Sequence, residues 1–219
     1  MVIPAAGRVE ATLFERAMQQ AVQTDTVETD RTRTRLLDAA YEQFCETGIG
    51  RTSMEEVARR AGTARITIYR KFATKDALVD AVMVREFQNY FIEFLDVMAQ
   101  APTPADRVVQ AFVTSLRTIG GNPLIRKLLE TEPAMVPGFV GGGDGRTLTV
   151  VRDFVAHQIL REQTAGNIPK RVRTIPAADL VVRIAGSFLT IPSDLMDYDD
   201  IGELSDFARE FLLPVLGLK

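Results

Sequence analysis

Hydrophobic residues recur at intervals of three and four along most of this chain, which is the spacing that places side chains on one face of an α-helix. Leu36, Leu37, Ala40 and Phe44 follow this rule and predict a first strongly patterned helix, which we expect to end at Gly48. The same spacing returns in longer segments up to the last residues. The pattern predicts an all-α protein.

Two shorter helices follow the first one. Ser53 with Glu56 three residues later has the form of a capping box, in which the hydroxyl and the carboxylate each satisfy a free backbone amide at the start of a helix. Gly62 is expected to end this helix, and a third is expected from about Arg65 to Phe72. Two short helices joined by a tight glycine-containing turn form a helix-turn-helix, whose second helix fits the major groove of DNA.

The charge of this segment differs from that of the whole chain. Residues 30–76 hold ten basic and seven acidic side chains, hence about +3, whereas the chain of 219 residues has a net charge of −3. A basic module on an acidic body is expected of a DNA-binding protein. Charge alone would also suit a solvated helical bundle, and it is the arrangement of the helices that favours DNA binding.

The run from Thr52 to Leu78, TSMEEVARRAGTARITIYRKFATKDAL, resembles the N-terminal domain of the TetR (tetracycline repressor) family. The resemblance implies a homodimeric, all-helical, ligand-responsive transcriptional regulator, most often a repressor. It also implies that Thr67 contacts a base or a phosphate, that Tyr69 and Lys75 contact phosphates, and that Arg65 stands at a variable position that commonly reads bases. The full set of candidate DNA-binding residues is Thr52, Arg65, Thr67, Tyr69, Arg70, Lys71 and Lys75.

One position departs from the family pattern. Ala64 stands where a serine often caps the recognition helix, so Thr63 could cap this helix one residue early. Ile66 occupies a position that often holds a small residue or proline. Its side chain could pack against a thymine methyl group or cover the start of the helix.

The chain divides into three expected parts. Residues 1–29 precede the module and could include a short helix; we favour a frayed tail over an arm that contacts DNA or a partner subunit. Residues 30–76 form the helix-turn-helix domain, and residues 77–219 form a helical ligand-binding and dimerisation domain. A long helix from about Lys75 to Gln100 joins the two and would act as a lever. The glycine-rich segment Glu132 to Gly145 suits a mobile lid better than a phosphate loop, because it lacks Gly-Lys-Ser/Thr.

The helical body has enough aromatic side chains to line an apolar cavity. The candidate pocket residues are Phe91, Phe94, Phe112, Phe154, His157 and Phe188. Each phenylalanine could equally be part of the core, and His157 could be an ordinary, partly exposed side chain. Because few charges share these faces, we expect an apolar or aromatic effector.

The last two helices would expose an apolar surface in a lone subunit. Pairing with the same helices of a second copy would cover it in a four-helix interface with two-fold symmetry. The candidate interface residues are Leu180, Ile184, Phe207 and Phe211. A dimer of this kind requires a palindromic, or nearly palindromic, double-stranded DNA operator.

Other functions are less well supported. The chain has one cysteine, Cys45, and one histidine, so we expect no disulfide, no zinc cluster and no other metal site. We find no paired acid and base and no cofactor motif, and we therefore expect neither an enzyme nor a bound cofactor. No signal peptide and no run of about 18 apolar residues is present, which favours a cytoplasmic location. The expected function is a repressor released by an unknown small effector; the alternative is a dimeric regulator controlled by protein partners.

Overall fold

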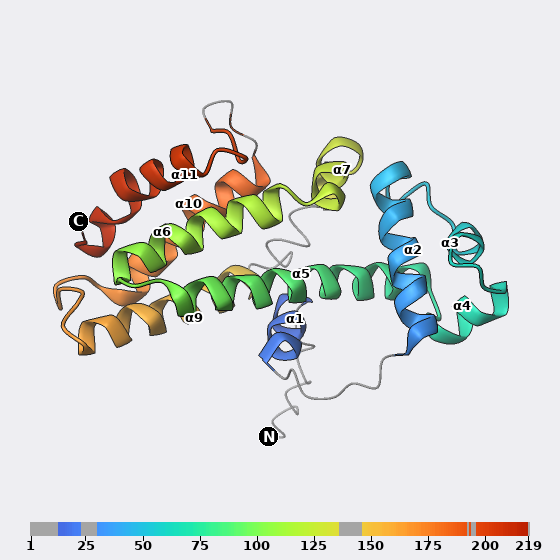
Figure 1. Ribbon diagram of the computed structural model, residues 1–219, viewed down its shortest axis with the longest axis horizontal. Helices are drawn as coiled ribbons and strands as arrows, with labels where there is room; N and C mark the ends of the chain where they lie inside the picture. Colours follow the sequence, from blue (N-terminus) through green and yellow to red (C-terminus); the bar gives the residue numbers. More distant parts are fainter. Residues whose placement is uncertain (1–12, 23–29, 136–145, 192, 194–195, 219) are drawn as a thin grey trace, which may run out of the picture.

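The computed structural model describes residues 13–22, 30–135, 146–191, 193 and 196–218. Within these ranges the regular structure is helical, which confirms the all-α prediction (Figure 1). The elements are α1 (Leu13–Val22), α2 (Arg31–Thr47), α3 (Met54–Arg60), α4 (Arg65–Lys71), α5 (Lys75–Gln100), α6 (Pro104–Ser115), η1 (Leu116–Gly120), α7 (Pro123–Thr131), η2 (Pro133–Met135), α9 (Arg146–Thr164), α10 (Thr174–Thr190), α11 (Ile201–Phe207), η3 (Ala208–Leu212) and η4 (Pro214–Leu216).

The long helix α5 connects two ends of the molecule (Figure 1). Helices α2, α3 and α4 gather around its first turns, whereas α6, α9, α10 and α11 surround its last turns. One hydrophobic core extends from Leu36 in the first group to Leu213 in the second. Packed side chains are therefore continuous between the two ends of α5.

Local capping sets the ends of the helices α2 and α3 as predicted. The Ser53 hydroxyl accepts the Glu56 N–H at 3.2 Å, and the Glu56 carboxylate accepts the Ser53 N–H at 2.8 Å, which completes the capping box. Gly48 and Gly62 end their helices with φ values of 87° and 62°, a region that side chains disfavour.

The recognition helix α4 begins without a side-chain cap. Ala64 is the N-cap residue and makes no side-chain hydrogen bond. The Thr63 hydroxyl donates instead to the carbonyl of Ala58 at 3.3 Å, so Thr63 does not take the capping role that we considered. The helix starts at Arg65.

The C-terminal end of the body is not one continuous helix. From Ile201 to Leu216 it contains α11, a π-helical segment and a 3-10 turn. Pro214 lacks the N–H that a continuous α-helix requires there, and the chain changes its hydrogen-bond pattern before it. Helix α10 starts at Thr174, so that Pro176 lies in its first turn, where proline is tolerated.

The expectation of a frayed N-terminal tail is wrong for residues 13–22. They form α1, which packs beside α5 (Figure 1). Ala17 is completely buried, and Arg16 forms an ion pair with Asp80 of α5 at 3.2 Å. Most of the glycine-rich segment interpreted as a lid lies outside the described residues.

Among the described helices, none combines the length and the apolar character needed to cross a membrane.

Candidate DNA-binding surface and effector cavity

Helix α4 buries one side and presents the other to solvent. Ile68 is fully buried and anchors the helix to the core of the module. Arg65, Tyr69 and Arg70 are exposed, and Ile66 is 78% exposed. Ile66 therefore does not cover the start of the helix, and its side chain is available for an apolar contact such as a thymine methyl group.

Glu55 of α3 holds two of the exposed side chains of α4 in place. Its carboxylate accepts from Arg65 Nε at 2.8 Å and from the Tyr69 hydroxyl at 3.2 Å. The Arg65 guanidinium also lies over the Tyr69 ring, 5.5 Å from its centre. We did not predict this role for Glu55, because the sequence shows only its place in the first turn of α3.

The two lysines of this surface are also oriented by the module itself. Lys71 forms an ion pair with Asp30, the N-cap residue of α2, at 2.6 Å. This hydrogen bond holds the pKa of the Asp30 carboxyl below its usual value. Lys75 Nζ donates to the carbonyl of Gly50 at 3.1 Å. Both ammonium groups remain at the surface, at opposite ends of the α4–α5 corner.

Thr52 lies in the interior, unlike the other candidates. Its side chain is 4% exposed, and its hydroxyl donates to the carbonyl of Gly48 at 2.8 Å and lies 3.1 Å from the Thr47 hydroxyl. The prediction that its side chain contacts DNA does not fit this burial. Thr52 instead stabilises the turn between α2 and α3. Thr67 is half-buried on α4.

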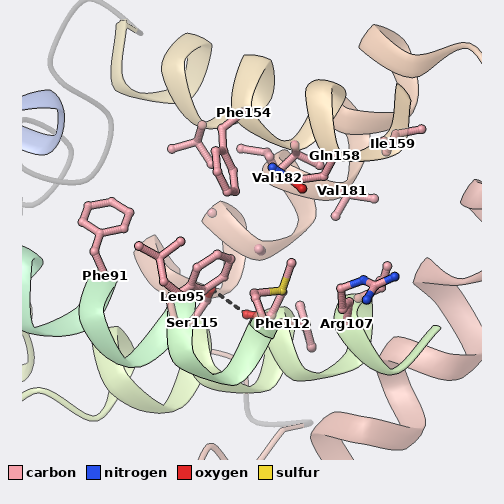
Figure 2. Close-up of a pocket in the computed structure, with 18 of the residues that line it drawn as sticks. Phe91, Leu95, Arg107, Phe112, Ser115, Phe154, Gln158, Ile159, Val181 and Val182 are labelled. Atoms are coloured by element: carbon pink, nitrogen blue, oxygen red, sulfur yellow. Dashed lines mark hydrogen bonds between the residues drawn. The ribbon is translucent and has the colours of Figure 1, made fainter. Parts of the chain in front are cut away.

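A cavity of about 520 Å³ lies in the body, lined by α5, α6, α9 and α10 (Figure 2). Four of the predicted pocket residues line it, namely Phe91, Phe94, Phe112 and Phe154. Figure 2 shows the rings of Phe91 and Phe154 directed into the space between α5 and α9. The volume is in the range of natural small-molecule sites.

Two of the predicted pocket residues lie elsewhere. Phe188 packs against two other rings instead of lining the cavity, with its ring centre 6.3 Å from that of Phe112 and 5.2 Å from that of Phe207. His157 is exposed, and its Nδ1 lies 2.8 Å from the carbonyl oxygen of Asp153. Successive residues of an α-helix are about 100° apart around its axis. Gln158, four residues after Phe154, therefore lies on the same cavity face of α9, whereas His157 does not.

The charged groups of the cavity are paired with each other, and so are the hydroxyls of Tyr90 and Ser115. At one end, Arg107 donates to Glu162 at 2.6 Å, and the same carboxylate accepts from Asn167 at 2.7 Å. In the middle, the Ser115 hydroxyl donates to the carbonyl of Ala111, so it accepts from the Tyr90 hydroxyl at 2.8 Å. Burial raises the pKa of Tyr90 to about 12, so its hydroxyl stays neutral even well above physiological pH. The lining therefore presents no unpaired charge among the described residues.

The cavity is elongated. Its lining on α9 extends from Thr147 to Glu162, which corresponds to roughly 22 Å at the helical rise. On α6 the lining extends from Pro104 to Ser115, roughly 16 Å. A slot of this length and volume suits a long, narrow apolar molecule.

Comparison with known proteins agrees with this geometry. Residues 36–82 match the family model described as bacterial regulatory proteins, tetR family. The uncharacterized HTH-type transcriptional regulator Rv1255c of Mycobacterium tuberculosis (strain ATCC 25618 / H37Rv) is 28% identical over 182 residues, which are 83% of this chain and 84% of that protein. The HTH-type transcriptional regulator UidR of Escherichia coli (strain K12) is 25% identical over 183 residues, which are 84% of this chain and 87% of UidR.

The solved structure of Salmonella enterica GusR has the same fold, with a TM-score of 0.65 at 20% identity, over 89% of this chain and all of GusR. The chain belongs to the TetR family. Members of this family are DNA-binding transcriptional regulators and not enzymes.

In this TetR-family regulator a second connection joins the cavity to the DNA-binding module. Ser115 and Ile119 line the cavity, and the π-helical segment η1 leads from them into α7. At the end of α7, Glu132 accepts the N–H of Gly50 at 2.9 Å, and the carbonyl of the same Gly50 accepts from Lys75. Two routes thus lead from the cavity lining to the helix-turn-helix, one along α5 and one from Ser115 and Ile119 through α7 to Glu132.

The regulator also exposes apolar side chains on its last helices. Leu180 is 47% and Phe211 is 51% exposed, as an interface would require. Ile184 and Phe207 are partly buried and pack against the core of the same chain, with the Phe207 ring stacked on Phe112 at 5.5 Å. These two residues therefore support the helices from the inside, and Ile175, Ile191 and Ile201 extend the exposed apolar set.

Proposed function

We propose that this regulator binds a palindromic operator as a homodimer and represses transcription until a long, narrow apolar effector enters its cavity. The observation that supports the proposal best is the elongated, charge-paired cavity, whose walls α5 and α6–η1–α7 continue into the helix-turn-helix. The effector class follows from the lining, because an ionised ligand would find no free counter-charge among the described residues.

The exposed side chains of α4 are assigned roles by their position. Arg65 and Ile66 read base edges, Thr67 contacts a base or a phosphate, and Tyr69 and Arg70 contact phosphates. Lys71 and Lys75 contact phosphates on either side of the α4–α5 corner. Glu55 keeps Arg65 and Tyr69 in a defined geometry before DNA arrives and lowers the ordering cost of binding.

The dimer forms through α10 and α11. Their exposed apolar residues, including Leu180 and Phe211, would be removed from water by the same helices of a second copy. Two-fold symmetry then places two recognition helices on successive major grooves, about 34–36 Å apart on straight DNA.

Release follows from differential affinity. An effector that prefers a wider cavity shifts α5 relative to α7, and the bond between Glu132 and Gly50 couples that shift to the turn before α3. The spacing of the two recognition helices changes, and operator affinity falls by at most the preference of the effector for the shifted form.

The test is a selection of operators from random-sequence DNA, followed by anisotropy titrations with and without candidate effectors. Ala111→Trp fills the cavity from α6, whereas Gln110→Trp adds the same bulk to an exposed neighbour on that helix. We expect Ala111→Trp to bind the operator and to lose ligand-dependent thermal stabilisation, while Gln110→Trp keeps both. Equal ligand stabilisation in the two variants would refute the cavity as the effector site, and operator binding without any ligand response in the wild type would favour control by protein partners.

A further inference from the structure

Helix α1 lies outside the segment that matches the family model, yet it is packed into the body. It runs beside α5, as Figure 1 shows, and it also touches α9. Ala17 is fully buried in this contact, and the Arg16–Asp80 ion pair fixes α1 to the first half of α5. Helices α5 and α9 form facing walls of the cavity, so α1 bridges the space between them.

Gln19 of α1 is itself part of the cavity lining. Its side chain is exposed and therefore lies at the rim of the cavity, whose lining on α5 begins with the buried rings of Phe87 and Phe91. The Arg107–Glu162 pair closes the opposite end, where α6 begins and α9 ends. The elongated cavity therefore has a neutral ion pair at one end and the carboxamide of Gln19 at the other.

We propose that α1 is a wall of the effector site and that Gln19 selects effectors with a neutral hydrogen-bonding group at the end that faces α1. A carboxamide donates and accepts hydrogen bonds and carries no charge, so it suits a hydroxyl or carbonyl group on an apolar body. The inference rests on the proposed effector function. It adds that α1, which lies outside the segment matched by the family model, forms one wall of the effector site and supplies a polar contact through Gln19.

The first experiment tests whether α1 must be docked on the body for a ligand to bind. Ala17→Arg places a charged side chain at the buried contact, and Gln20→Arg adds the same charge to an exposed position of α1. Binding of the neutral fluorescent probe N-phenyl-1-naphthylamine to the chain of 219 residues is measured for both variants. We expect Ala17→Arg to bind the probe at least fivefold more weakly and Gln20→Arg to stay within twofold of the wild type. Equal binding by wild type and Ala17→Arg would overturn the inference.

A second variant tests the contact without endangering the fold. Gln19→Leu changes one exposed side chain, with Gln20→Leu as its control. Displacement of the probe by 4-hexylphenol is compared with displacement by hexylbenzene, which differs only by the hydroxyl. We expect Gln19→Leu to reduce the preference for the phenol by about fivefold, the usual value of one hydrogen bond. An unchanged preference would overturn the role of Gln19.

The outcomes also distinguish this inference from the proposed function. If the wild type binds its operator and takes none of the three compounds, the effector function and this inference both fall. If the wild type binds the compounds and every α1 variant behaves like it, only the inference falls.

Discussion

Replacing Lys75 with alanine removes a cation that we assign to the DNA backbone. Lys75 Nζ lies at the surface, 3.1 Å from the carbonyl of Gly50, and the dimer would present two such groups. Each phosphate contact releases counterions and contributes about 0.9 to the slope of log K against log salt concentration, so the variant should lose about 1.8 from that slope. Between 50 and 200 mM salt, the wild type should then lose roughly 12-fold more affinity than the variant.

The assay is fluorescence anisotropy with the selected operator at four or more KCl concentrations. Lys170→Ala is the matched control, because Lys170 is exposed on the connector between α9 and α10, at the end of the body away from the helix-turn-helix (Figure 1). Its slope should equal that of the wild type. A Lys75→Ala protein with normal thermal stability and an unchanged slope would refute the assignment of Lys75 to the backbone.

Three further changes test the surface and its supports. Glu55→Gln should raise affinity for unrelated DNA by about fivefold, since it removes a negative charge near the phosphates. It should also lower the ratio of operator affinity to unrelated-DNA affinity, measured by competition. An unchanged ratio would contradict the role of Glu55 in orienting Arg65. Glu132→Ala should lower the Tm by about 2–4 °C through loss of about 1 kcal/mol at the Gly50 contact, whereas Glu130→Ala, which removes only an exposed ion pair, should not. Hydrogen bonds hold the pKa values of Asp30 and Glu56 below their usual range. The ionised carboxylates therefore stabilise the folded state fully above the ordinary carboxyl pKa of about 4, and this stabilisation is lost as the pH falls through the lowered values. A Tm that already declines between pH 8 and 5 in scanning calorimetry would argue against these two caps as the source of acid sensitivity.

Local signals in the chain were enough to place the helix-turn-helix. The ends of α3 depend on Ser53, Glu56 and Gly62, whose hydrogen bonds and backbone angles involve residues only a few positions away. The range Lys75–Gln100 was also predicted correctly, because Thr74 caps α5 at its start and an apolar face continues through it. Such features need no knowledge of distant contacts.

Features that depend on packing between helices could not be predicted from the spacing of apolar residues. An apolar spacing shows that a phenylalanine faces inward, but whether it meets a cavity, as Phe154 does, or another ring, as Phe188 does, depends on how closely neighbouring helices approach. The burial of Thr52, the grip of Glu55 on Arg65 and the docking of α1 on α5 likewise join residues whose proximity arises only when the elements assemble. The sequence of one helix determines its caps and its apolar face, whereas cavities and contacts between helices depend on how the helices pack in the tertiary structure.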